Sequence, residues 1–223
     1  NVEPSFEHHF AAYGFWAPAI HDYQENSIFD RLDTPRGKEL QTFIDPYNYR
    51  DRYTMPKFLL NSSGDQFFVP DSAQFYFADL PGEKYVRYFP NTGHGLDLSA
   101  VGAVTTFYKS ILAGADRPKF TWTVQDDGAI VVNCRTEPKE VKLWQATNTE
   151  KRDFRIDVLG AMWTSAPLEV RSKGVYVGRP AEPEKGWTAY FVELTFDGGE
   201  VGPYQFTTEV RVLPKTLPFA EKN

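Results

Sequence analysis

The chain has 223 residues, of which 41% are hydrophobic and 24% charged, the composition of an ordinary globular protein with one large domain or two small ones. Its formal net charge is −6, so electrostatics gives no support for binding to nucleic acid or to an anionic membrane. No stretch approaches the roughly 18–20 apolar residues of a membrane-spanning helix, and no membrane span is expected.

The first residue and the single cysteine say little about where the protein works. The chain begins with Asn1 and shows no signal peptide, which suggests a processed product, a truncated chain or a proteolytic fragment. Cys134 excludes an internal disulfide and follows an apolar run, so a buried, unreactive thiol is expected. Cysteine usage therefore leaves the cellular compartment open.

The first part of the chain, to about residue 116, mixes helical and strand patterns. Residues 6–23 are rich in aromatic residues and begin with helical spacing. Beyond residue 23, strands are predicted over 57–61 and 85–89, and helices over 71–80 and 98–112. Asp71 is a candidate cap for the helix over 71–80, and Pro81 and Gly82 form a turn that would end it. This order is typical of a parallel sheet with crossover helices.

Beyond about residue 117 the pattern changes to short alternating strands separated by turn residues. The predicted strands cover 120–124, 130–134, 141–145, 168–170, 175–177, 187–196 and 205–213. Such a series predicts an antiparallel β-sandwich of immunoglobulin or fibronectin type III shape. We therefore divide the chain into an α/β part over 1–116, a β-sandwich over 117–215 and a tail over 216–223.

Two polar residues follow the predicted parallel strands at comparable points. Asp65 comes just after the strand at 57–61, and His94 follows the strand at 85–89, one strand–helix–strand unit later. Neighbouring parallel strands lie roughly 4.8 Å apart, so loops at the same edge can bring the carboxylate to the imidazole. Asp65 would then orient His94 as a general base towards a serine or cysteine. The alternative is that each residue merely caps or decorates a turn.

The nucleophile that such a pair requires is not evident. No Gly-x-Ser-x-Gly motif occurs in the chain. Ser62 and Ser63 belong to the same strand end as Asp65, and Ser5 and Ser27 lie in unpatterned surroundings, so all four are poor candidates. Two parallel strands also form a short sheet, which suggests that further strands belong on its N-terminal side.

Six motifs follow one another along the first part of the chain: Ala12–Tyr23, Asp30–Pro35, Asp45–Arg52, Met55–Phe58, Gly64–Ser72 and Leu80–Lys84. Together they resemble the PhoPQ-activated pathogenicity-related protein family, which includes secreted autocrine proliferation repressors. The resemblance covers most of residues 5–115 and implies an α/β-hydrolase-like domain followed by a β-sandwich, with export to the periplasm or cell exterior. It implies that Asp65 and His94 occupy the positions of the family's acid and histidine, with the serine upstream of this chain.

Other residue groups admit both functional and structural interpretations. His8, His9 and His21 suggest a metal site, but no carboxylate or cysteine completes a ligand set at the usual spacing, so neither metal nor cofactor is expected. The aromatic belt over 6–16 could line an acyl or peptide pocket or could pack against the missing half of the domain. Arg50 and Arg52 are expected to form structural ion pairs rather than to contact a substrate. Tryptophans 122, 144 and 187 lie in strand-like runs and are expected in the core rather than on a sugar platform, whereas Trp163 lies in an irregular stretch that favours neither.

The sequence leaves more than one function open. The first is a serine-hydrolase-type enzyme for peptide, amide or ester bonds, completed by an upstream half that carries the nucleophile, so this chain alone would be inactive. The alternative is a non-catalytic secreted signalling or virulence-related binding protein on a hydrolase scaffold. A third, weaker hypothesis makes the β-sandwich a sugar-binding module.

Overall fold

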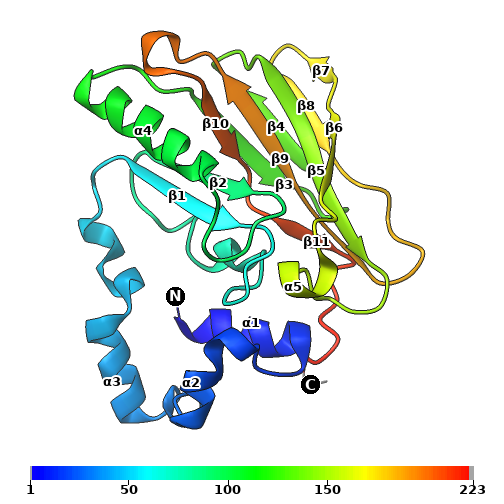
Figure 1. Cartoon of the computed structure of the whole chain (residues 1–223). Helices are drawn as coiled ribbons and strands as arrows, with labels where there is room; N and C mark the ends of the chain where they lie inside the picture. Colours follow the sequence, from blue (N-terminus) through cyan, green and yellow to red (C-terminus); the bar gives the residue numbers. More distant parts are fainter. Residues whose placement is uncertain (1, 221–223) are drawn as a thin grey trace.

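The computed structural model describes residues 2–220, which form a helical base below two β-sheets (Figure 1). The α-helices are α1 (Val2–Tyr13), α2 (His21–Glu25), α3 (Pro35–Ile44), α4 (Ser99–Leu112) and α5 (Ile156–Leu159). The 3-10 helices are η1 (Pro18–Ile20), η2 (Phe29–Arg31), η3 (Pro46–Arg52), η4 (Ser72–Phe75) and η5 (Gly199–Val201). The strands are β1 (Lys57–Ser62), β2 (Lys84–Phe89), β3 (Phe120–Val124), β4 (Ile130–Cys134), β5 (Glu140–Asn148), β6 (Thr164–Pro167), β7 (Val170–Ser172), β8 (Val175–Gly178), β9 (Trp187–Phe196), β10 (Tyr204–Thr207) and β11 (Arg211–Leu213).

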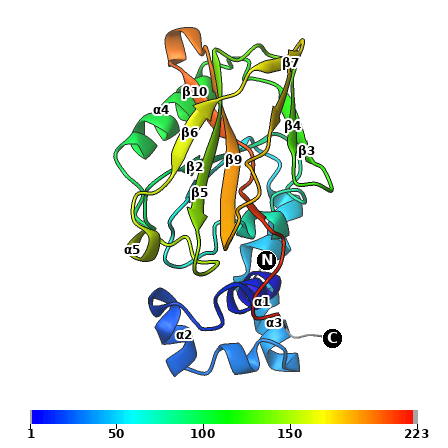
Figure 2. The same cartoon turned by 90° about the vertical axis from the view of Figure 1, so that its right-hand side faces the viewer.

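The larger sheet is continuous across the predicted boundary near residue 117. Its strand order is β1-β2-β10-β9-β5-β6, with β11 also paired to β9, whereas the smaller sheet has the order β3-β4-β8-β7. β1 and β2 are parallel, and β10 joins β2 in antiparallel orientation at Thr207 and Val86. The Thr207 hydroxyl also accepts the Tyr88 N–H at 3.1 Å. The parallel pair and the later antiparallel strands therefore belong to one sheet, of which β5, β6, β9 and β10 are seen in Figure 2.

The two sheets share a hydrophobic core. One cluster combines Tyr85 of β2 and Phe107 of α4 with buried residues of the later strands, which are Ile130, Val132, Val141, Leu143, Tyr190, Val192, Leu194, Phe196, Tyr204, Phe206 and Leu213. Burial of this apolar surface is the main force that holds the sheets together. Residues from both sides of position 117 pack in this cluster, although the division of the chain into domains stays a prediction.

Most predicted elements are observed, and the mixture of helices with two sheets confirms an α/β part combined with a β-rich part. The strands expected over 120–124, 130–134 and 187–196 have those bounds. The strand expected over 205–213 is divided into β10 and β11, and β6 was not predicted. Within the described residues, no helix has the length and apolar character that crossing a membrane requires.

The helix predicted over 71–80 is wrong, because only the short η4 forms there. Asp71 makes no side-chain cap. Its carboxylate instead contacts His8 of α1 and Arg152, which follows β5. Tyr76 then takes φ −146° and ψ −30°, outside the helical region, and ends the segment. Tertiary ion pairing has therefore displaced the local cap on which the prediction depended.

Candidate active site

The loops after β1 and β2 lie side by side at one edge of the sheet. The parallel register runs from Lys57 beside Lys84 to Ser62 beside Phe89, so both strands end at the same level. Beyond the strands, the Ser63 N–H donates to the Phe89 carbonyl at 3.1 Å, and the Gly64 N–H donates to the Thr92 carbonyl at 3.0 Å. Backbone hydrogen bonds thus carry the pairing from the strands into the loops.

Asp65 and His94 meet across this edge, as the sequence predicts. The Nδ1 atom of His94 lies 3.1 Å from Oδ1 and 3.0 Å from Oδ2 of Asp65. The Asp65 side chain is only 11% exposed, whereas the His94 side chain is 49% exposed. With Nδ1 donating to the carboxylate, Nε2 is the nitrogen that remains able to accept a proton. The pair therefore has a buried acid and an accessible imidazole.

The carboxylate of Asp65 is held in place by its own loop. Its Oδ1 atom accepts the Phe67 N–H at 2.7 Å and the Phe68 N–H at 3.3 Å. Hydrogen bonds from these backbone N–H groups fix the direction of the carboxylate. The Phe67 ring also packs on the His94 ring, with centroids 4.3 Å apart. The same short segment thus positions both members of the pair.

Gln66 is a further contact of His94 that the sequence did not reveal. Its Oε1 atom accepts the His94 backbone N–H at 2.9 Å. A β-carbon on Gly93 would lie 2.9 Å from this oxygen, so a larger residue there would displace the Gln66 amide. The one signal in the sequence is the glycine directly before His94, which is compatible with many loop geometries.

The β-rich part of the chain supports the same loops. The Ile156 N–H of α5 donates to the Gly64 carbonyl at 2.9 Å. The Asn91 amide donates to the Trp163 carbonyl at 3.0 Å and accepts the Trp163 N–H at 2.9 Å. Asn91 has φ +59°, a left-handed conformation that asparagine tolerates better than most residues. Residues beyond position 150 therefore fix both loops.

The serines near the pair are engaged in structural contacts. The hydroxyl of Ser62 donates to the Thr92 carbonyl, and the Ser63 hydroxyl accepts the Asn91 N–H at 3.1 Å. Both serines are buried. A cavity of about 220 Å³ lies beside Asp65, and Ser5 and Ser62 are among its lining residues. The hydroxyls of Ser62 and Ser63 are nevertheless occupied by their contacts with the loop after β2.

Comparison with known proteins places the chain in a family. A model of the PhoPQ-activated pathogenicity-related protein family matches residues 1–155, a range that contains Asp65 and His94 and extends into the β-rich part. The chain belongs to this family. It is 35% identical over 247 residues to autocrine proliferation repressor protein A of Dictyostelium discoideum, an alignment that covers 98% of the chain and 50% of that relative. The chain thus spans about half the length of this relative.

The histidines near the N-terminus of this PhoPQ-related protein do not converge on one metal site. His8 contacts Asp71 at 2.9 Å, and the Nε2 atom of His9 accepts the Ala17 N–H at 3.1 Å. Burial, reinforced by Arg155, lowers the pKa of His9 to about 4. His21 instead lies with the carboxylates of Asp22 and Glu25, and ligand atoms of these three exposed residues fall within 4.8 Å of one another. Sequence reasoning did not find that group.

Trp122, which was predicted to belong to the core, and Trp163, which the sequence did not place, both pack against other rings. Trp163 is buried against Phe191, with ring centroids 5.3 Å apart. Trp122 stacks on Phe77 at 5.4 Å and on Phe120 at 5.9 Å. These contacts favour packing over a sugar platform at both positions.

Burial also decides the state of the single thiol. Cys134 is a free, half-buried cysteine, and burial raises its pKa to about 11. Because the nucleophile is the thiolate, the thiol form that dominates at neutral pH is poorly reactive.

Proposed function

We propose that this chain supplies the acid and the histidine of a Ser-His-Asp triad in a secreted or periplasmic serine-hydrolase-like protein. The serine would lie on the polypeptide upstream of this chain. The observation that carries the proposal is the contact of His94 Nδ1 with both carboxylate oxygens of Asp65, at 3.1 and 3.0 Å, in a histidine whose side chain is half exposed. The bond to be hydrolysed would be a peptide, amide or ester bond.

The chemistry follows from these positions. His94 Nε2 would take the proton of the serine hydroxyl as the oxygen attacks the substrate carbonyl, and would later return it to the leaving group. Asp65 would hold the ring in the tautomer with hydrogen on Nδ1 and stabilise the imidazolium. Backbone donors at Phe67 and Phe68 keep that carboxylate directed at the ring. These steps require no cofactor.

The proposal includes the finer architecture, an α/β-hydrolase-like domain followed by an immunoglobulin-like or fibronectin-like β-sandwich. Among the described strands β1 ends the order of the larger sheet, so its outer edge can accept another parallel strand. On and just before α4, exposed apolar side chains form a series, which comprises Leu98, Val101, Val104, Tyr108, Ile111 and Leu112. The remaining half of a hydrolase domain would extend the sheet at β1 and cover this series.

An active-site-directed fluorophosphonate probe tests the proposal on a full-length protein that includes the upstream half. We expect covalent labelling that is reduced at least about a hundredfold in His94→Ala and in Asp65→Asn. His21→Ala is the matched control, because His21 is an exposed histidine on α2 whose side chain pairs with the exposed Glu25 at 3.5 Å. Absence of labelling, or labelling that His94→Ala leaves unchanged, would refute the hydrolase assignment.

A second function is favoured by one specific observation. The relative with 35% identity is named as an autocrine proliferation repressor, so a secreted signalling protein that uses the hydrolase scaffold without catalysis is the alternative. Repression of proliferation, or a host-interaction phenotype, would then survive the double variant Asp65→Asn, His94→Ala. Loss of that response in a folded double variant would favour catalysis instead.

A further inference from the structure

The cavity of about 220 Å³ beside Asp65 lies between α1, the loop after β1 and η4. Asp65, Phe68, Val69 and Pro70 line it, so the loop that holds the carboxylate also forms one wall of the cavity. Phe68 is 50% exposed, and the centroid of its ring lies 6.1 Å from that of the His94 ring. A group bound in this cavity would therefore lie directly beside the proposed catalytic pair.

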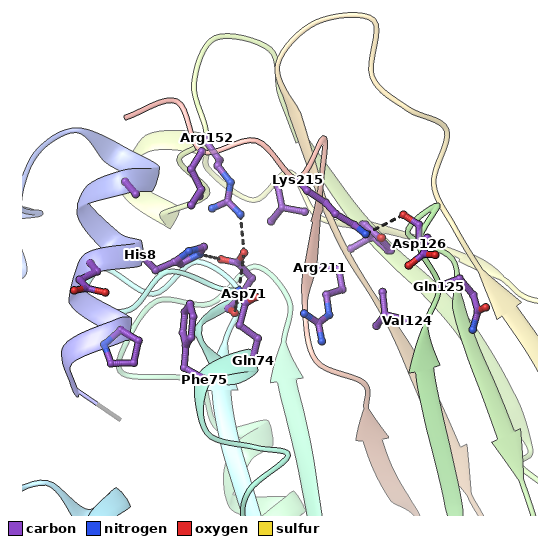
Figure 3. Close-up of a pocket in the computed structure, with 16 residues that line it drawn as sticks. His8, Asp71, Gln74, Phe75, Val124, Gln125, Asp126, Arg152, Arg211 and Lys215 are labelled. Atoms are coloured by element: carbon purple, nitrogen blue, oxygen red, sulfur yellow. Dashed lines mark hydrogen bonds and ion pairs between the residues drawn. The ribbon is translucent and has the colours of Figure 1, made fainter. Parts of the chain in front are cut away.

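The opposite wall of the cavity is helix α1, which contributes Ser5 and Phe6. An ion-pair network holds this helix in place, because His8 Nε2 lies 2.9 Å from Oδ1 of Asp71 and Oδ2 of Asp71 accepts from Arg152 Nη2 at 2.6 Å. Figure 3 shows His8 and Arg152 pointing at this carboxylate, where they also line a second, larger cavity. A pocket whose walls are fixed in this way loses little conformational entropy when a ligand binds.

The lining of the cavity beside Asp65 favours a neutral, apolar group. Asp65 is the one charged residue among the described residues that line it, and its carboxylate already contacts His94 and accepts two backbone N–H groups. Because no Lys, Arg or His is among those lining residues, an anionic group would lose its hydration there without gaining a cationic partner. The apolar surface is supplied by Phe6, Phe68, Val69, Pro70, Tyr76 and Tyr88.

The volume and the remaining polar groups of the cavity limit what that group can be. An engineered apolar cavity of about 150 Å³ binds benzene, so about 220 Å³ holds a group of about six to eight carbon atoms. The Asn61 amide donates to the Tyr76 hydroxyl at 3.1 Å, and the Ser62 hydroxyl donates to the Thr92 carbonyl. Since these polar groups already have partners, a phenyl or alkyl group fits the lining better than a sugar ring with several hydroxyl groups.

We propose that the substrate of the candidate active site carries a neutral, apolar acyl group of about six to eight carbon atoms, which this cavity holds. The inference rests on the proposed hydrolase function and names its substrate class. The serine oxygen would bond to the acyl carbon as the leaving group departs with the proton that His94 returns, and water would then release the acyl group as a free acid. Through Phe6, the aromatic belt of α1 would form part of this acyl pocket.

Hydrolysis of p-nitrophenyl esters by a full-length protein that includes the upstream half tests the proposal. The hexanoate and acetate esters differ by four CH₂ groups, each worth about fourfold when fully buried. We therefore expect kcat/KM to be at least about tenfold higher for the hexanoate ester than for the acetate ester. The mono-p-nitrophenyl ester of adipic acid has the same chain length but ends in a carboxylate, and its kcat/KM should be no higher than that of the acetate ester.

Two cavity variants and a matched control accompany these substrates. Phe68→Ala removes a ring from the cavity and keeps the backbone N–H that Asp65 accepts, whereas Ser5→Leu reduces the volume of the cavity. Each should lower the hexanoate-to-acetate ratio of kcat/KM by about threefold or more. Phe43→Ala should leave the ratio unchanged, because Phe43 is an exposed phenylalanine of α3 that does not line the cavity. A ratio measured within one variant does not depend on how much of that variant is folded.

Fluorophosphonate labelling of the same samples separates this inference from the hydrolase proposal on which it rests. Absence of labelling in the wild type overturns both. Labelling that is accompanied by equal kcat/KM for the hexanoate and acetate esters, by an adipate ester as good as the hexanoate ester, or by an unchanged ratio in both cavity variants overturns the acyl-group inference alone. Labelling together with a preference for the neutral hexanoate ester that falls in at least one cavity variant, and not in Phe43→Ala, supports it.

Discussion

Replacement of Asp71 by asparagine is expected to destabilise the protein strongly. The carboxylate joins three segments that are distant in the sequence, through His8 at 2.9 Å and Arg152 at 2.6 Å. Asp71→Asn keeps the shape but removes the negative charge, which leaves the guanidinium of Arg152, only 2% exposed, without a counter-ion. Breaking a buried ion pair on one side typically costs about 3–5 kcal/mol.

The free energy of unfolding should therefore fall by about 3 kcal/mol, because the amide oxygen of asparagine still accepts one hydrogen bond. For a chain of this size that corresponds to a decrease in Tm of about 6–12 °C. Urea denaturation followed by circular dichroism measures the free energy, and a thermal melt measures Tm. Asp33→Asn is the control, since Asp33 forms an exposed pair with Lys38 at 3.8 Å and should cost less than about 1 kcal/mol.

The pH dependence of the free energy of unfolding gives a second test of the same ion-pair network. Because the pKa of Asp71 is held below its ordinary value in the folded protein, its contribution to stability is present above the unfolded pKa of about 4. The contribution is lost as pH falls below that value. The stability difference between wild type and Asp71→Asn should thus be constant from pH 7 to about 5 and shrink below about pH 4. A loss no larger than that of Asp33→Asn at pH 7 would refute the reasoning.

Two further substitutions test burial and close packing. The pKa of His9 is lowered to about 4 in the folded protein, whereas the unfolded chain binds that proton near pH 6.5. The free energy of unfolding should therefore decrease by up to about 3 kcal/mol as the pH is lowered from 6.5 to 4. His9→Phe should flatten this slope in urea denaturation at several pH values, and an unchanged slope would contradict the assignment. Gly64→Ala should cost about 2–3 kcal/mol, because its β-carbon would lie 2.9 Å from the Thr92 carbonyl oxygen. Gly102→Ala in α4 meets nothing within 4 Å and should stabilise by up to about 1 kcal/mol, so equal effects of the two would argue against the clash.

The contact between Asp65 and His94 could be predicted because it depends on local pattern. Each residue follows an apolar strand, and parallel strands bring their ends to one edge. The contacts of Gln66 and Ile156 with the same loops could not be predicted in this way. Gln66 joins the same two loops as Asp65, but a glutamine in a loop fits many other structures. The Ile156 contact depends on the path of a segment that is distant in the sequence.

The predictions that failed also failed because of contacts between segments that are distant in the sequence. Asp71 has the features of a helix cap, but its carboxylate gains more from Arg152 and His8 than from a nearby N–H, and only the short η4 forms. The junction between β2 and β10 has a register of one residue pair, Val86 with Thr207, and no local pattern specifies it. Local periodicity predicts elements, whereas long-range polar contacts decide how they join.

The hydrogen bonds between the β-rich part and the loops of the candidate site suggest why the two parts of the chain share one sheet. The β-rich part contributes hydrogen bonds to the loop of Asp65 through Ile156, and to the loop of His94 through Trp163. A catalytic pair needs its members held to within a fraction of an ångström, which surface loops rarely achieve alone. If the pair is catalytic, the β-rich part acts as the rigid support of the acid and the histidine. The upstream polypeptide then has only to bring the nucleophile to an imidazole that is already oriented.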